Sequence, residues 1–202
     1  MDLTPHLCPD FDQNIERLME RKLLVVLLIL LGCRYAGAQD LAIKTNLLHD
    51  ASASVNAGVE VGLGPHWTAD FSGGYNPWTF NDNRKWKHWI VQPELRYWLC
   101  GCFNAAFVAA HIQGGQYNIG GVDWKDFDST RREGWFIGAG LGFGWQFILS
   151  RKLNLELELG AGYNYTRYDS FRCRHCGEKI QDDMPYNYWG ITKAAIGLVY
   201  AL

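Results

Sequence analysis

The sequence predicts an all-β fold, an eight-stranded antiparallel up-and-down transmembrane β-barrel. The first observation is a two-residue alternation over residues 134–149, where bulky apolar side chains alternate with residues that are mostly glycine. This period is typical of a β-strand, and the run is about twice the usual strand length, which suits a tilted strand crossing a hydrocarbon layer. The second observation is that short and long connections alternate along the chain. The third is the abundance of Trp and Tyr, which membrane interfaces favour.

An N-terminal extension and a cleaved signal peptide are expected over residues 1–38, followed by one barrel domain over residues 39–202. Two basic residues precede the apolar run 23–31, and the small residues at 36–38 provide a cleavage site. This run is too short for a membrane-spanning helix, which needs about 20 residues.

The start of the chain and the site of processing have alternatives. Residues 1–18 carry several acidic side chains, which is unusual ahead of a signal peptide, so Met19 is favoured over Met1 as the true start. A lipidated Cys33 is the alternative to cleavage after residue 38. Either route takes the chain out of the cytoplasm.

The first four strands are expected at residues 42–49, 56–63, 66–75 and 87–99, where apolar side chains recur at every second position. Residues 50–55 form an intermediate connection, Gly64 and Pro65 a tight turn, and 76–86 a long loop. Pro93 lies within the fourth strand and cannot donate to the ladder, so we expect a bulge or a bend there.

The last four strands are expected at residues 103–113, 134–149, 153–166 and 188–202. Residues 100–102 and 150–152 form tight turns, whereas 114–133 and 167–187 form long loops. No helical period interrupts the eight strands. The turns and both termini of the mature chain are therefore expected on the periplasmic side and the long loops outside the cell.

The two faces of each strand differ in character, with residues such as Leu155 and Leu157 on one face and Glu156 and Glu158 on the other. A soluble barrel would place the apolar face inside. The interior of an eight-stranded barrel is only just wide enough for side chains, and the aromatic residues of 134–149 and its neighbours would overfill it. We therefore expect the apolar face to contact lipid, and the glycines to make room inside for charged side chains.

A polar network is expected in the lumen. Its members are Lys44, Glu60, Asp70, Glu94, Arg96, Glu156, Glu158 and Lys193. Unpaired burial of charge is expensive, so we expect Asp70 to pair with Arg96, and Glu156 or Glu158 with Lys193. The favoured interpretation is a hydrogen-bonded plug. The excess of acidic side chains leaves open a proton or ion route, or paired carboxylates for catalysis.

Cys173 and Cys176, with His175 between them, form the one compact cluster of metal-ligand types in the sequence. A lone CxxC lacks the second pair that structural metal sites need, so a loop disulfide is expected after export and no metal site. A metal site that includes His175 is the alternative. Cys100 and Cys102 lie in a turn at the opposite end of the barrel, where pairing with the first two is not expected.

Three aromatic residues within the long loops, Trp78, Phe80 and Trp124, are candidates for a contact surface with a partner or a glycan. Most other aromatic residues near the loops are expected to form an interfacial girdle. His111 is expected to form hydrogen bonds at the outer rim. No nucleophile elbow or paired-carboxylate motif accompanies it, so neither enzymatic activity nor a cofactor is expected.

Segments along nearly the whole mature chain resemble an uncharacterised family of small exported outer-membrane β-barrel proteins of Bacteroidetes, a domain of unknown function. They are residues 42–48, 58–64, 72–80, 85–89, 91–98 and 111–121. The resemblance implies an OmpX/OmpW-like architecture in the cell outer membrane, with outer-membrane lipid and the barrel-assembly machinery as partners. Cys173 and Cys176 are not part of the family pattern. The family has no established reaction, and its association with fimbrial gene clusters implies a surface or fimbrial partner.

The formal net charge of −2 gives no indication of a nucleic-acid partner. We therefore expect a non-enzymatic outer-membrane barrel whose extracellular loops serve envelope structure, surface interaction or a fimbria-related role. The main alternative is a narrow pore or small-ligand uptake through the polar lumen. A membrane enzyme working at the outer rim is less favoured.

Overall fold

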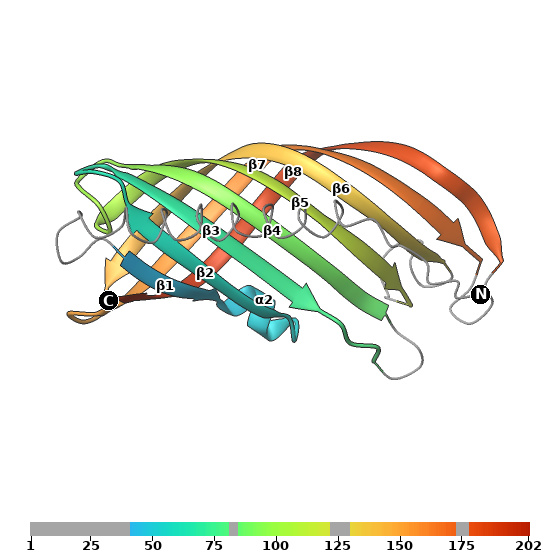
Figure 1. Cartoon of the computed structure of the whole chain (residues 1–202), viewed down its shortest axis with the longest axis horizontal. Helices are drawn as coiled ribbons and strands as arrows, with labels where there is room; N and C mark the ends of the chain where they lie inside the picture. Colours follow the sequence, from blue (N-terminus) through green and yellow to red (C-terminus); the bar gives the residue numbers. More distant parts are fainter. Residues whose placement is uncertain (1–40, 81–84, 122–129, 173–177) are drawn as a thin grey trace, which may run out of the picture. The chain divides into compact units, whose positions relative to one another are not determined.

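The computed structural model describes residues 41–80, 85–121, 130–172 and 178–202. Its strands are β1 (Leu41–Asn46), β2 (Val55–Gly62), β3 (Trp67–Asn76), β4 (Lys85–Trp98), β5 (Ala105–Gly120), β6 (Arg131–Ile148), β7 (Leu153–Phe171) and β8 (Lys179–Ala201). Each strand pairs with the next in antiparallel order, and β1 pairs with β8 to close the ring (Figure 1). The predicted all-β fold, with eight antiparallel strands closed into a ring in up-and-down order, is therefore confirmed.

Several predictions fall on residues outside the described part of the chain. They are the leader over 1–38 with Met1, Met19 and Cys33, the loop residues Cys173 and Cys176, and Trp124. Within the described ranges, no helix is long and apolar enough to cross a membrane.

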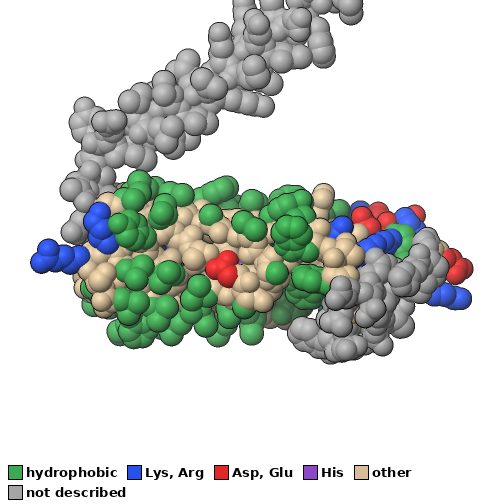
Figure 2. Space-filling model, turned by 90° about the horizontal axis from the view of Figure 1, so that it is seen from below, with side chains coloured by type: hydrophobic (Ala, Val, Ile, Leu, Met, Phe, Trp, Pro, Cys, Tyr) green, Lys and Arg blue, Asp and Glu red, His purple; other side chains and the backbone are tan. Residues whose placement is uncertain are grey.

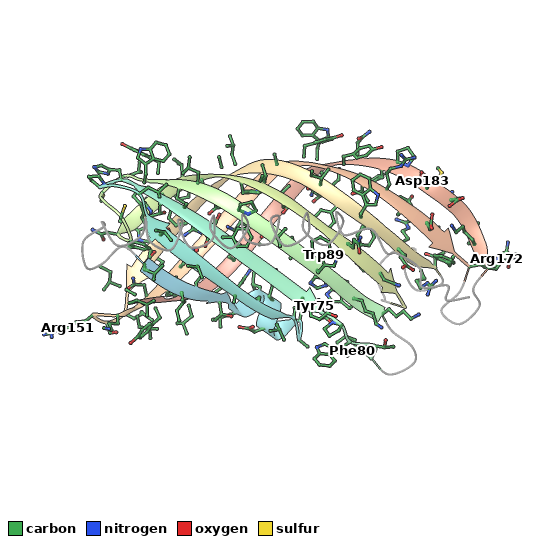
Figure 3. The ribbon with its side chains drawn as sticks, in the orientation of Figure 1. Tyr75, Phe80, Trp89, Arg151, Arg172 and Asp183 are labelled. Atoms are coloured by element: carbon green, nitrogen blue, oxygen red, sulfur yellow. The ribbon has the colours of Figure 1, made fainter. Side chains whose placement is uncertain are left out.

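Short connections alternate with longer ones around the ring. Residues 63–66, 99–104 and 149–152 connect strands at one end, which we call the turn end. Residues 47–54, 77–84, 121–130 and 172–178 connect them at the other end, which we call the loop end. Arg151 and Arg172 mark the two ends in Figure 3.

At the loop end the strands extend further than the sequence predicted. The ladder pairs Arg131 with Phe171, and Phe171 with Lys179, so much of the expected loops 114–133 and 167–187 is strand. The prediction was wrong here because backbone pairing continues where the apolar alternation has stopped. Polar residues on both faces of a strand give no period-two signal.

The first strand is shorter than predicted, and a helix follows it. β1 ends at Asn46, whose side chain accepts a hydrogen bond from the backbone N–H of Leu48 and caps helix α2 (Leu47–Ala51). Five residues make little more than one helical turn, which is too short to produce a detectable period. The expectation that no helix interrupts the strands was therefore wrong.

Pro93 does not produce a bulge. β3 pairs Phe71 with Pro93 in unbroken register, and toward β5 the pairs Val91–Gly114 and Glu94–His111 keep one register. On the β5 side, only the two residues between Val91 and Glu94, which are Gln92 and Pro93, have no pairing partner. Since proline lacks an N–H, it interrupts the ladder toward β5 without shifting it.

The two faces of the sheet follow the predicted alternation. In β6, outward residues from Trp135 to Phe147 are exposed, whereas Gly144 and Gln146 on the inner face are buried. Figure 2 shows hydrophobic side chains over much of one face of the barrel, with most of the charged groups toward its ends.

Candidate functional site

The interior at the turn end is closed by aromatic packing. Trp98 and Phe107 are fully buried with ring centroids 4.7 Å apart, and Phe103 packs against Trp98 at 5.9 Å. The Trp98 indole Nε1 donates to Thr68 Oγ1 at 2.9 Å, so its polar atom is satisfied inside the barrel. The cluster therefore forms a packed apolar layer inside the barrel at the turn end.

Arg96 lies at the centre of the charged layer above this cluster. Its guanidinium is fully buried and lies over the Phe107 ring, with Cζ 4.3 Å from the ring centroid. It donates to four carboxylates, which are Glu94 (2.5 Å), Glu156 (2.6 and 3.0 Å), Glu158 (2.8 Å) and Glu60 (2.9 Å). A planar guanidinium with five N–H donors suits this arrangement, because each N–H group can donate to a separate carboxylate oxygen.

Two lysines from the neighbouring strands β1 and β8 complete the charged layer. Lys44 Nζ lies 2.6 Å from Glu60 and 3.3 Å from Asp70. Lys193 Nζ lies 2.7 Å from Glu94 and 3.2 Å from a Glu158 oxygen. The carboxylate of Asp70 accepts no hydrogen bond among the described residues, but it lies within 4.0 Å of both lysines and Arg96.

The structure brings all eight residues of the predicted lumen network into one cluster inside the barrel. Of the expected pairs, Asp70–Arg96 is the longest contact at 4.0 Å, and Lys193 contacts Glu158. The dominant partner of Arg96 is instead Glu156, which lies across the lumen from it. Cross-lumen pairs of this kind depend on how strands far apart in sequence face each other, which residue spacing does not reveal.

A layer of amide and imidazole groups lies next to the charged layer, and sequence reasoning missed most of it. Gln92 donates to Gln113 at 2.5 Å, and Gln113 donates to Asn164 at 2.7 Å. His111 was expected at the outer rim, but it is buried in the lumen, where Nε2 lies 2.9 Å from Thr192 Oγ1. The spacing along the strand could have revealed these residues. His111 and Gln113 are an even number of positions from the inward residue Phe107, so they lie on the same face of the strand.

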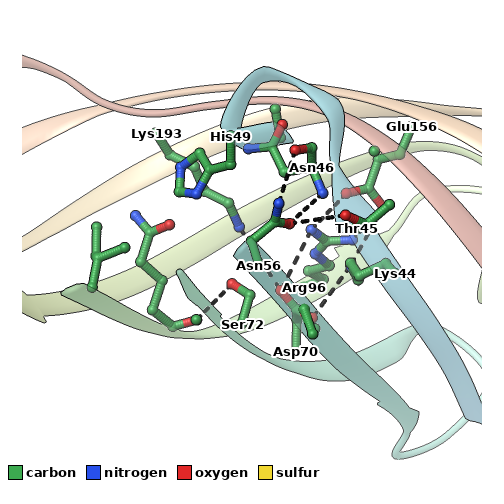
Figure 4. Close-up of a pocket in the computed structure, with 17 residues that line it drawn as sticks. Lys44, Thr45, Asn46, His49, Asn56, Asp70, Ser72, Arg96, Glu156 and Lys193 are labelled. Carbon is green, nitrogen blue, oxygen red and sulfur yellow. Dashed lines mark hydrogen bonds and ion pairs between the residues drawn. The ribbon is translucent and has the colours of Figure 1, made fainter. Parts of the chain in front are cut away.

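A small polar cavity lies where β1 ends (Figure 4). Its volume is about 40 Å³, and its lining includes Lys44, Asn56, Asp70 and His49. This space holds about one to three water molecules, which is too little for an organic solute.

His49 brings the helix α2 against this cavity. Burial lowers the pKa of its imidazole below 6.5, the charge of His88 adds to this, and Asp50 acts in the opposite direction. The imidazole of His49 packs against Gly74, where an added Cβ would lie 2.7 Å from Nδ1. The helix thus places His49 at the edge of the lumen, next to the charged layer.

The chemistry available to the interior follows from its charges. Five carboxylates face three cations, so neutralisation within the layer is incomplete if every group is ionised. Across the described ranges, no group of three or more His, Cys, Asp or Glu residues is arranged to hold a metal ion. The arrangement is suited to cross-linking the wall and excluding solutes.

The remaining predicted contact residues lie at the loop end. Trp78 and Phe80 follow β3 and are about half exposed, at 49% and 42%. The Trp78 indole donates to the carbonyl of Ala53 at 2.9 Å, which ties this segment to the end of the α2 connection. At the turn end, Cys102 Sγ donates to the carbonyl of Gly64 at 2.9 Å.

A family model with the description "Protein of unknown function (DUF3575)" matches residues 23–202, which include every strand of the barrel. No curated protein and no solved structure matches the chain.

Proposed function

The chain belongs to the DUF3575 family of proteins of unknown function, and on this basis we propose that it is a non-enzymatic outer-membrane barrel with a closed interior. Its loop end would face the outside of the cell and serve envelope structure, surface interaction or a fimbria-related role. Outer-membrane lipid and the barrel-assembly machinery would be its general partners.

The observation that carries this proposal is the distribution of polarity across the wall. The exposed outer face of β6 carries Trp135, Ile137, Leu141, Phe143, Trp145 and Phe147. The inner face of the ring holds the charged layer. If this barrel were soluble, water would have to hydrate the apolar outer face, which costs free energy. Lipid tails contact the same face without this cost.

The height of the apolar belt also fits a membrane. From Trp135 to Phe147 the strand rises about 41 Å along its own axis, or about 29 Å across the layer at a tilt of about 45°. This is close to the hydrocarbon thickness of a bilayer. Aromatic residues lie at both ends of the span, as interfacial girdles do.

Solute flux tests whether the interior is closed. The purified protein is reconstituted in liposomes that contain a small dye and a concentration gradient of KCl. We expect neither dye release nor stable ion conductance, because Arg96 and the aromatic cluster fill the lumen. Steady conductance by the wild-type protein would instead support the alternative of a narrow pore.

A further inference from the structure

The outer wall has an open hollow near the loop end, which we call the upper hollow. It has a volume of about 480 Å³, and its lining includes Tyr75, Trp89, Gln116, Asn118, Glu133 and Trp135. Tyr75 and Trp89 are paired across β3 and β4, and Figure 3 shows both at this end of the sheet. Tyr75, Trp89 and Trp135 are 41–56% exposed, so they are free to contact a ligand.

A second hollow, which we call the lower hollow, lies on the same wall nearer the turn end. It has a volume of about 490 Å³, and its lining includes Val59, Phe71, Pro93, Leu95, Ala110 and Ile112. Its side chains are almost entirely apolar. It therefore offers space to a hydrocarbon chain and no hydrogen bond to a polar group.

The strand register places the two hollows in line. Trp89 pairs with Gln116 in the upper hollow, and the next outward pair toward the turn end is Val91 with Gly114. Gly73 pairs with Val91 from the β3 side, so glycines flank this row on both sides. The next outward residue of β4 is Pro93, in the lower hollow. A shallow path about 13 Å long thus joins the two along β4.

The upper hollow has the chemistry of a sugar site. Asn118 Nδ2 donates to Glu133 Oε2 at 3.0 Å, while Asn118 Oδ1 accepts no hydrogen bond among the described residues. Trp89 Nε1 donates to Gln116 Oε1 at 3.2 Å, which fixes the indole face. Flat aromatic faces pack against the C–H faces of a sugar ring, and amide and carboxylate oxygens accept from its hydroxyl groups.

The charges of the upper hollow are balanced by neighbouring groups. Lys87 is accompanied by Glu133 and Asp169, whose carboxylates lie 3.9 Å from Arg131 and 2.8 Å from Lys179, so the lining has no excess of one sign to select an ionic headgroup. We propose that this wall binds a glycolipid, with a neutral sugar headgroup in the upper hollow and an acyl chain in the lower hollow. The proposal rests on the membrane location proposed above.

Binding of lipid to the purified full-length protein in detergent micelles tests this proposal. Native mass spectrometry counts bound monoglucosyl diacylglycerol and, in a parallel titration, bound phosphatidylglycerol. We expect one glucosyl lipid to be retained in preference to phosphatidylglycerol. Equal retention of both lipids would overturn the proposal.

Variants of two matched tryptophans distinguish a sugar site from a general interfacial girdle. Trp135 and Trp145 lie on the same outward face of β6 and are 42% and 43% exposed, but only Trp135 lines the upper hollow. We expect Trp135→Leu to weaken glucosyl lipid binding about threefold to tenfold and Trp145→Leu to leave it unchanged. Equal losses in the two variants would show a girdle and overturn the proposal.

The acyl part of the proposal has its own variant. A Cβ at Gly114 meets only the backbone oxygen of Phe136 at 3.6 Å, so Gly114→Leu fits the wall and fills the path between the hollows. We expect it to lower glucosyl lipid binding, with Ala161→Leu on the outer face of β7 as control. Competition by methyl glucoside as strong as that of the glycolipid would overturn the lipid assignment.

Failure of this proposal is distinguishable from failure of the proposed function. Insertion into phosphatidylcholine vesicles is measured separately, by flotation. A protein that inserts but shows no headgroup preference contradicts glycolipid binding and leaves the membrane location intact. A protein that does not insert contradicts the location itself.

Discussion

Replacing Arg96 with Met is expected to destabilise the barrel by at least about 3–5 kcal/mol, the cost of breaking one buried ion pair. Arg96 is fully buried and makes hydrogen bonds to four carboxylates, so its removal leaves five carboxylates facing two lysines. Methionine keeps the packing volume of the aliphatic stem, which limits the change to lost charge and hydrogen bonding. The loss in the free energy of unfolding should be larger than the loss caused by removing any ion pair on the surface.

Urea unfolding in detergent micelles, followed by tryptophan fluorescence, measures this loss. Arg151→Met, in the exposed turn between β6 and β7, is the matched control and should change the free energy of unfolding by less than about 0.5 kcal/mol. Adding Glu156→Gln to the Arg96→Met variant should restore part of the stability, because it removes one of the unpaired charges. A variant Arg96→Met as stable as the Arg151→Met control would refute the reasoning that the charged layer holds the wall together.

Three further expectations concern the interior. Gly144→Ala should cost about 1–3 kcal/mol in urea unfolding, because its Cβ would collide with the buried Phe107 ring, whereas Gly64→Ala, with open space around it, should cost almost nothing. Trp98→Ala should cost about 3–5 kcal/mol by the same assay, and a smaller loss would mean that the cluster collapses around the space. His49 has a lower pKa folded than unfolded, so the unfolded state binds more protons and stability falls as pH drops below 6.5. The protection factors of the Ser52 and Ser54 amides, which bond the His49 carbonyl, should therefore decrease below this pH, and in His49→Asn they should not.

The strand pattern could be predicted because lipid and lumen impose opposite demands on successive residues. The run 134–149 shows this most clearly, since apolar side chains and glycines alternate without exception over most of its length. The extensions of β7 and β8 at the loop end could not be predicted in this way. Where both faces meet polar surroundings, hydrogen bonding between backbones persists but no longer selects side chains.

The residues of the site could be predicted better than the contacts between them. Period-two parity assigns Glu94 and Arg96 to one face of β4, and the structure places both inside the barrel. The approach of Arg96 to Glu156 across the lumen depends on the stagger of strands around the ring, which one sequence does not contain. His111 was misplaced because its strand extends beyond the predicted end at residue 113, which moves it from the rim to the middle of β5.

The polarity of the wall is tested most directly by fractionating expressing cells and comparing heated and unheated samples of each fraction on a gel. The account expects the mature protein in the outer-membrane fraction, with an unheated band that migrates faster because the barrel stays folded. A protein recovered in the soluble periplasm, with the same mobility before and after heating, would contradict it.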